Sequence, residues 1–347
     1  MNKTKHFRVM VLDLQLFADV TNATTSSSTG NNLSAEMKTF YDKVLLREAG
    51  PKLVHEQFGQ KRDIPRGNGK TIEFRKFNQL PKALTALTEG VTPDGGALDA
   101  TSLTATVAQY GYFLRISDVL DLTAIDNVIV EATQLLGSQA GVTMDTVVRN
   151  QLVAGNNVLF CPTVSNGTET AVTQRKDMNT TSQLTVKMIQ KAATLLKNNN
   201  VPDFDGCYVA IIHPSVAYDL RKSKDWVEAH KYAATTELFN GEIGELHGMR
   251  FIEDVFAPVL TGNNYKNKAN GATYACYAFG KDSFGIIDPD GGGAEMIVHD
   301  KSEIGGPLNQ FSTIGYKFET NGATMLYPER MLRVMAVSSY SATDTAN

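Results

Sequence analysis

The fold of this chain is decided by residues 70–117, KTIEFRKFNQLPKALTALTEGVTPDGGALDATSLTATVAQYGYFLRIS. Alternation of apolar and polar residues predicts a strand at Thr71 to Phe77 and another at Leu103 to Ile116. About 25 residues separate them, carrying two prolines, three glycines and only scattered apolar side chains. A connection that long is uncommon inside a compact domain. We therefore expect a hairpin that does not fold back onto its own core.

The composition indicates a globular protein with sizeable cores. The chain has 347 residues, 42% hydrophobic and 20% charged, a length that suggests roughly two domains. Lys and Arg total 33 against 37 for Asp and Glu, a net charge of -4. This balance argues against a protein that mainly grips nucleic acid. Cys161, Cys207 and Cys276 are far apart and form no CxxC, so we expect buried thiols in a reducing compartment.

The first 33 residues are predicted to be a flexible segment. Basic residues precede an apolar run, but Asp13 and Gln15 interrupt it, which is not typical of a signal peptide. Leucine alternates with them over residues 12–16, which indicates a half-buried strand or an interaction arm. Residues 21–32 form a polar linker. No run of 18 apolar residues exists, so we expect no membrane-spanning helix.

Two helices are predicted around the hairpin. Ser34 is a good N-cap for a helix through Ala49, which follows the linker and is expected to pack as an arm. The longest helical pattern covers residues 126–154, about 45 Å at 1.5 Å per residue. Gly137 and Gly141 lie inside it and predict a bend or close packing. We expect this rod to be a strut with a sheet laid along it.

The remainder alternates helix and strand, so the fold class is α+β with mixed sheets. The predicted helices are 184–197 and one that opens at His213-Pro214-Ser215 and ends near 222; the predicted strands are 207–212, 249–256, 273–279 and 283–287. Near the C-terminus, STIGYKFET (312–320) and RMLRVMAV (330–337) lie on either side of Asn321-Gly322 and predict a hairpin-like pair.

A search for catalytic chemistry finds no convincing site. GNGKT at 67–71 is not a phosphate loop, because its first glycine would have to replace Ile64. The acidic, glycine-rich clusters at 92–96 and 288–293 are best explained as turns. The six histidines form no HExxH or ligand pair, and His213 is interpreted as a helix-entry residue whose ring caps the backbone. We expect no catalytic residue, cofactor or metal, and no enzyme.

The hairpin is rich in basic and aromatic side chains. Seven basic residues lie between residues 61 and 82 against two acidic ones, which indicates a solvated strand face or a charged arm that meets an acidic surface of a neighbouring subunit. Aromatic residues on an extended element are either stranded or buried against a partner. An exposed strand edge also invites uncontrolled pairing unless another chain covers it. These observations favour an obligate assembly.

Stretches along most of the chain carry a family resemblance. They are LSAEMKTFYDKVLLREAGPKLVHEQFGQKRDIPRGNGKTIEFRKF (33–77), LPKALTALTEGVTPDGG (80–96) and ATVAQYGYFLRISDVLDLTAIDNVIVEATQLLGSQAGVTMDTVVRNQL (105–152), followed more loosely by YVAIIHPSVAYDLRKSKDW, GEIGELHGMRFIEDVFAP and FGIIDPDGGGAEMIVHD. Together they resemble the major capsid proteins of tailed bacteriophages with the Hong Kong 97-type fold. LDLQLFA at 12–18 is similar to a segment at the start of many phage head proteins, with Asp13 where asparagine is usual.

The resemblance implies a division of the chain. It would comprise a flexible segment (1–33), an N-arm (34–60), an E-loop hairpin (61–117), a peripheral domain with the spine helix (118–180), an axial domain (181–305), and return strands of the peripheral domain with the C-terminal tail (306–347). The E-loop would lie over an adjacent subunit. Candidate subunit contacts are Phe40, Tyr41, Phe74, Arg75, Lys76, Phe77, Leu80, Leu84, Leu87 and Glu89.

The function implied is that of a self-assembling head protein. Hexamers and pentamers would form an icosahedral shell, assembled in the host cytoplasm and carried in the virion, that encloses double-stranded DNA without sequence-specific binding. A scaffold protein or segment, a portal and decoration proteins are the further partners implied. Two alternatives stay open: a cellular nanocompartment shell of the same fold, and a cytoplasmic enzyme with its site near His213 and Asp288.

Overall fold

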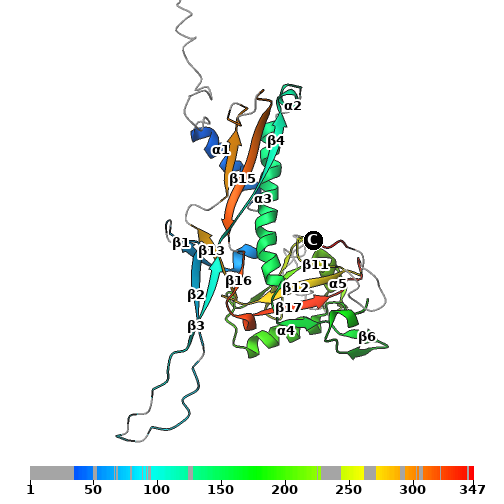
Figure 1. Ribbon diagram of the computed structural model, residues 1–347. Helices are drawn as coiled ribbons and strands as arrows, with labels where there is room; N and C mark the ends of the chain where they lie inside the picture. Colours follow the sequence, from blue (N-terminus) through cyan, green and yellow to red (C-terminus); the bar gives the residue numbers. More distant parts are fainter. Residues whose placement is uncertain are drawn as a thin grey trace, which may run out of the picture.

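The computed structural model shows an elongated spine joined to a wider body, from which a hairpin projects (Figure 1). The structure describes residues 35–49, 53–65, 67, 69–78, 80–87, 89–90, 92, 95–123, 128–224, 226–227, 244–261, 271–289, 294–301, 303–304, 308–320, 322–341 and 344–347. The predicted N-terminal segment, its strand or arm at 12–16, the linker at 21–32 and the cap Ser34 lie outside these residues. Within the described part of the chain, no helix has the length and apolar character needed to cross a membrane.

The spine is built on one long helix, α3 (Val128–Val153), close to the bounds predicted. Its 26 residues span about 39 Å. Buried side chains recur along one stripe at helical spacing: Ala132, Leu136, Ala140, Val148 and Leu152. The helix therefore offers apolar surface over its whole length, and two separate cores form on it.

The N-terminal helix α1 (Ala35–Ala49) packs against α3 at the two glycines. A Cβ on Gly141 would lie 2.5 Å from the carbonyl oxygen of Ala49, and one on Gly137 would lie 3.1 Å from the Cβ of Glu48. Any larger residue at 141 would collide with backbone atoms of α1. The close packing predicted from these glycines is confirmed.

A three-stranded antiparallel sheet, here the spine sheet, lies along the first half of α3. Its order is β14 (Glu295–His299), β15 (Phe311–Thr320) and β4 (Ala108–Ser117), and the short helix α2 (Asp118–Thr123) follows β4 at the tip. The inward residues pack with Leu45 of α1 and the stripe of α3: Ile116, Met296, Ile314, Tyr316 and Phe318. This is the sheet that the sequence predicted along the strut.

The body is a seven-stranded mixed sheet, here the body sheet. Its order is β5 (Val158–Phe160), β17 (Met331–Ala336), β12 (Thr273–Phe279), β8 (Tyr208–Ile212), β10 (Met249–Glu253) and β9 (Glu245–Leu246), with β11 (Val259–Leu260) also paired to β12. Helices α4 (Val186–Asn198) and α5 (Pro214–Lys222) cover the face that carries Ala210 and Cys276. The other face, with Val209 and Tyr277, packs on Val148 and Leu152 of α3.

Shorter elements connect these layers. A small sheet has the order β1 (Gln60–Ile64), β13 (Phe284–Pro289) and β16 (Thr324–Met325), and a two-stranded ribbon is formed by β6 (Thr163–Ser165) and β7 (Thr168–Thr170). Three 3-10 turns are η3 (His55–Phe58), η4 (Arg175–Asp177) and η5 (Pro328–Arg330).

Two predictions about strands are wrong. STIGYKFET and RMLRVMAV do not pair with each other, because β15 pairs with β14 and β4 while β17 pairs with β12 and β5. Elements β16 and η5 separate them, and β17 is buried on both faces, as a central strand is. The strands within residues 306–347 belong to three sheets: β15 to the spine sheet, β16 to the small sheet and β17 to the body sheet. The predicted strand 103–116 is also divided at Val107, because its two halves pair with different partners.

The Gly141→Ala variant tests the close approach of α1 and α3. Alanine favours helix, but here its Cβ meets backbone, so we expect destabilisation of roughly 1–3 kcal/mol, measured by thermal unfolding of the unassembled subunit. Gln139→Ala, at an exposed position of the same helix, is the control and should change little. A Gly141→Ala subunit at least as stable as the wild type would contradict this packing.

Candidate assembly surfaces

The hairpin predicted from the opening stretch is present. Strands β2 (Thr71–Phe77) and β3 (Ala100–Thr106) pair in antiparallel register from Thr71–Thr106 to Phe77–Ala100. Asn78 closes the base of the connection, where its N–H donates to the Asp99 carbonyl oxygen (3.1 Å). Beyond this point residues 78–99, here the hairpin loop, run away from the body (Figure 1).

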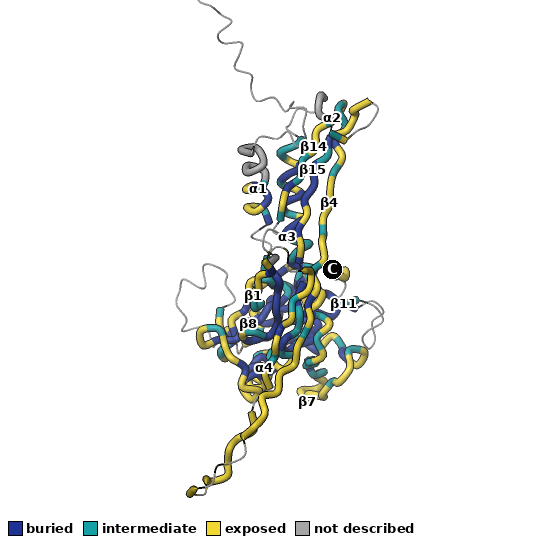
Figure 2. The backbone as a smooth tube through the Cα atoms, turned by 60° about the vertical axis from the view of Figure 1, so that its left-hand side comes forward, coloured by how far each residue is buried: buried dark blue, intermediate teal, exposed yellow. Residues whose placement is uncertain are grey.

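The hairpin loop carries apolar side chains that its own chain leaves uncovered. Leu80, Leu84, Leu87 and Leu98 are 58%, 86%, 76% and 69% exposed. Figure 2 shows the described residues of the loop as exposed. Single exposed leucines are ordinary, but four on one projecting loop mark a surface that another molecule covers.

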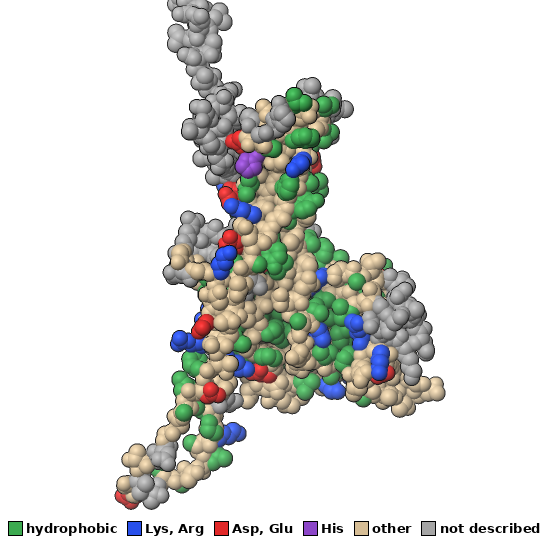
Figure 3. Space-filling model, viewed as in Figure 1, with side chains coloured by type: hydrophobic (Ala, Val, Ile, Leu, Met, Phe, Trp, Pro, Cys, Tyr) green, Lys and Arg blue, Asp and Glu red, His purple; other side chains and the backbone are tan. Residues whose placement is uncertain are grey.

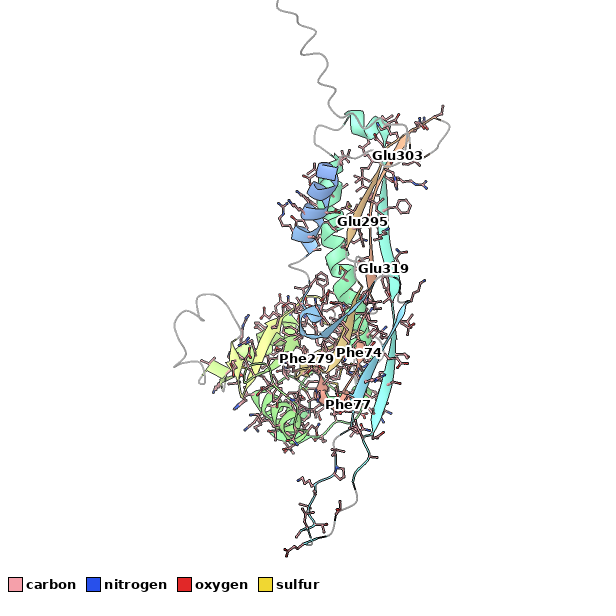
Figure 4. The ribbon with its side chains drawn as sticks, turned by 90° about the vertical axis from the view of Figure 1, so that its left-hand side faces the viewer. Phe74, Phe77, Phe279, Glu295, Glu303 and Glu319 are labelled. Carbon is pink, nitrogen blue, oxygen red and sulfur yellow. The ribbon has the colours of Figure 1, made fainter. Side chains whose placement is uncertain are left out.

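The base of the hairpin, in contrast, belongs to the core of its own subunit. Phe74 is buried with Ile64, Ala105, Ile287 and Leu326. The Phe74 ring lies against Gly285, where an added Cβ would come within 2.6 Å of the ring. The guanidinium carbon of Arg62 lies 5.0 Å from the ring centroid. Figure 4 shows Phe74 nearer to the body and Phe77 nearer to the loop. The apolar surface of Phe74 is therefore buried within its own subunit, whereas the Phe77 side chain is 52% exposed and free to contact a neighbour.

Polar contacts tie the hairpin to η5. Lys76 Nζ donates to Glu329 Oε1 (3.0 Å). Two cations lie over the Tyr327 ring: Lys76 Nζ is 4.8 Å from the ring centroid, and the guanidinium carbon of Arg330 is 3.8 Å from it. Burial alone would raise the pKa of Glu329, but a backbone N–H, the bond from Lys76 and the nearby cations lower it below its usual value overall. The pair is therefore formed at neutral pH and is lost as the pH falls through that lowered pKa.

A groove lies on the outer face of the spine sheet. The strand register places Ile297, Gly315 and Phe113 in one row, between a row of Glu295, Lys317 and Gly111 and a row of His299, Thr313 and Arg115. Gly315 cannot be replaced, because a Cβ would lie 2.7 Å from that of Phe113, and a Cβ on Gly111 would lie 2.6 Å from the Tyr316 carbonyl oxygen. The glycines leave a hollow of about 260 Å³, here the sheet groove.

The walls of the sheet groove are apolar and its ends are charged. Phe113 is 57% exposed, and hydrophobic side chains lie along this side of the spine in Figure 3. At one end Lys317 Nζ lies 3.3 Å from Glu295 Oε2; at the other His299 Nδ1 lies 3.0 Å from Glu303 Oε2. Figure 4 shows Glu303, Glu295 and Glu319 in a row along the spine. An apolar hollow whose ends carry charged side chains of both signs suits an apolar segment flanked by charged residues.

The predicted contact residues are distributed over three environments. Phe40 and Tyr41 lie in α1, and their side chains are outside the described part. Phe74 is buried and Lys76 is bonded to Glu329. The remaining candidates are exposed on the hairpin and its loop: Arg75, Phe77, Leu80, Leu84, Leu87 and Glu89. The sheet groove was not predicted, although both strands contain a glycine beside aromatic residues, in QYGYF and TIGYKF.

The residues considered for an enzyme do not form a common site. His213 is the N-cap of α5, and its Nδ1 accepts a hydrogen bond from the Ser215 N–H (3.2 Å), so the capping role predicted for it is confirmed. Burial lowers its pKa. Asp288 lies in β13, which belongs to the small sheet with β1, whereas His213 follows a strand of the body sheet.

Comparison with known proteins finds phage capsid proteins by sequence family and by structure. The model of the phage capsid protein family matches residues 83–317. The capsid of cyanophage Pam1 is 15% identical with a TM-score of 0.62, over 93% of this chain and 100% of that one. The capsid of Ralstonia phage GP4 is 14% identical with a TM-score of 0.60, over 81% and 87%. These likenesses confirm the Hong Kong 97-type capsid fold that the sequence predicted. No curated protein sequence matches.

Lys76→Ala tests whether the contacts with η5 hold the hairpin in place. Exposed ion pairs contribute little, so we expect a stability loss below about 1 kcal/mol. Hydrogen–deuterium exchange should nevertheless become faster in β2 and β3, because the base has lost its tether. Lys70→Ala, an exposed lysine of the same hairpin, is the matched control. Equal protection in the two variants would show that Lys76 does not restrain the hairpin.

Proposed function

This chain belongs to the phage capsid protein family, and we infer that it is the major capsid protein of a tailed double-stranded DNA bacteriophage or prophage. Its place is then the capsid of the virion. The observation that supports this function best is the hairpin loop, which projects from the body and exposes four leucines. A shell subunit needs such a surface, because most of its stability comes from its neighbours.

We propose that the hairpin loop of one subunit lies in the sheet groove of the next. The loop offers Leu84 and Leu87, and the groove offers Phe113 and Ile297 beside a floor of glycine. Full burial of a leucine stabilises by roughly 2 kcal/mol, so a few leucines per interface suffice when every subunit repeats the contact. The basic side chains of the hairpin would lie beside the glutamates of the neighbour's spine sheet. Such charge pairing would fix the position of the loop along the groove more than it would strengthen binding.

The resemblance to phage head proteins supports a proposal for the finer assembly. Subunits would form hexamers and pentamers that close an icosahedral shell in the host cytoplasm, aided by a scaffold protein or segment, a portal and decoration proteins. The shell would enclose double-stranded DNA without sequence-specific binding, in keeping with a net charge of -4. The same proposal leaves no catalytic role for the chain. A nanocompartment shell would share the fold, but the family match favours the phage protein.

Electron microscopy and a sizing column test the function directly. The wild-type chain, expressed alone or with its scaffold, should form shells, tubes or rings of five or six. The Leu84→Ser/Leu87→Ser variant should stay unassembled with an unchanged circular dichroism spectrum, because both side chains are exposed in the subunit. Val164→Ser, at an exposed valine of β6, is the control that should still assemble. A wild-type chain that stays monomeric under all these conditions would refute the assembly function.

Phe113→Ala tests the groove as the receiving surface. Removing one wall should raise the concentration needed for assembly roughly tenfold, which corresponds to about 1.4 kcal/mol. In the Phe113→Ala/Leu84→Ser double variant, the loss of assembly free energy should be smaller than the sum of the two single losses, because both substitutions remove the same contact. Phe311→Ala, at the end of the same sheet, is the control and should add independently. Strict additivity of Phe113→Ala and Leu84→Ser would place the loop elsewhere.

A further inference from the structure

Three acid–base side chains meet where three parts of the subunit join. His55 lies in η3, near the end of the N-terminal arm; Asp145 lies in α3; and Asp254 directly follows β10 of the body sheet. They are 0%, 0% and 6% exposed. The sequence predicts no metal site, because these residues are far apart in the chain and form no local motif. The fold nevertheless brings one atom of each within 4.8 Å of the others.

In both Asp145 and Asp254, one carboxylate oxygen accepts hydrogen bonds from backbone N–H groups, and the other oxygen points towards His55 Nδ1. Asp145 Oδ1 accepts hydrogen bonds from the N–H groups of Val54 (2.8 Å) and His55 (2.7 Å), and its Oδ2 lies 2.7 Å from His55 Nδ1. Asp254 Oδ1 accepts from the Phe256 N–H (2.9 Å), and its Oδ2 lies 3.5 Å from the same Nδ1. Two oxygens and one nitrogen therefore converge, with their orientation fixed by backbone donors.

Within the described part of the chain, this convergence leaves polar atoms without hydrogen-bond partners. Neither Asp254 Oδ2 nor His55 Nε2 has one, although both are buried. A buried charged oxygen without a partner costs several kcal/mol. The nearby Arg149 does not fill this role directly, since its guanidinium donates to the Phe256 carbonyl oxygen (2.7 Å) and to Asn150 Oδ1 (2.9 Å).

We propose that this cluster binds a divalent transition-metal ion through His55 Nδ1, Asp145 Oδ2 and Asp254 Oδ2. One imidazole and two carboxylates suit Zn²⁺ or Mn²⁺, and two carboxylates neutralise a divalent charge. On binding, the ring takes its Nε2–H form: the proton on Nδ1 passes to Nε2 where that nitrogen is bare, or to solvent where Nε2 already carries one, and the freed Nδ1 lone pair forms the metal bond. Tetrahedral metal bonds of about 2.0–2.2 Å place two ligand atoms roughly 3.3–3.6 Å apart, so the 2.7 Å contact between Nδ1 and Oδ2 must widen by roughly 0.6–0.9 Å.

The ion would satisfy the Asp254 oxygen but not the second ring nitrogen, since His55 Nε2 has no hydrogen-bond partner among the described residues. With Nδ1 on the ion, Nε2 carries the proton. The His55 ring meets the Tyr277 ring edge to face, with centroids 5.8 Å apart and planes at 82°. The backbone N–H groups on each Oδ1 are the outer contacts that keep metal ligands oriented. An ion here would join the end of the N-terminal arm, the spine helix and the body.

The test measures metal in the full chain as purified. Elemental analysis should find close to one zinc or manganese ion per chain, in free subunits and in particles alike. Because the ligands are buried, the ion is removed by unfolding with a chelator and restored by refolding with Zn²⁺, which should raise the melting temperature by roughly 5 °C. Refolding with Co²⁺ should give a visible absorption band from the bound ion.

A matched pair of variants separates binding from folding. Asp254→Asn keeps an oxygen for the Phe256 N–H but should reduce the bound metal at least tenfold. Asp219→Asn removes the charge of another buried carboxylate, bonded to the Ser339 N–H, and should bind metal as the wild type does. If Asp254→Asn does not fold, the metal content of the wild-type chain decides whether the site exists. Less than about 0.1 ion per chain after refolding with Zn²⁺, with an unchanged melting temperature, would overturn the site and leave the assembly function untouched.

Discussion

The architecture depends on one helix that supplies two cores. The first half of α3 packs on the spine sheet and α1, and its second half packs on the body sheet through Val148 and Leu152. A helix of 26 residues is stiff on this length scale, so it fixes the distance between the two sheets. The close approach at Gly141 adds the N-terminal arm to the same rod. Displacing α3 would therefore disturb every other layer at once.

The base and the loop of the hairpin have different environments. Its base is anchored within the subunit by the buried ring of Phe74 and by the contact of Lys76 with Glu329. Among the described residues of its loop, none makes a comparable contact with the body, and the leucines are exposed, with Leu84 86% exposed. An anchored base limits the directions that the loop can take, which reduces the entropy lost when a neighbour binds it. For the proposed contact, the anchored base would therefore direct the loop towards the neighbouring subunit.

Local elements followed from the sequence because their causes are local. The bounds of β2 and β12 agree residue for residue with the strands predicted at 71–77 and 273–279, and His213 caps α5 as its position before Pro214 predicts. Strand pairing did not follow, since a glycine after β15 is as compatible with a turn to β16 as with a hairpin to β17. The sheet groove needs register between strands about 200 residues apart, which no single segment encodes.

The sheet groove also shows why weak contacts suit a shell. Its ends carry exposed ion pairs such as Glu295 with Lys317, which contribute little to stability but oppose a misplaced charge. Its centre offers only Phe113, Ile297 and the bare backbone of glycine, so an incoming segment gains modest apolar contact. One such contact dissociates readily, and a misplaced subunit can leave. When neighbouring contacts close a ring, the same modest energies act together, and the assembled lattice becomes stable without any single strong interface.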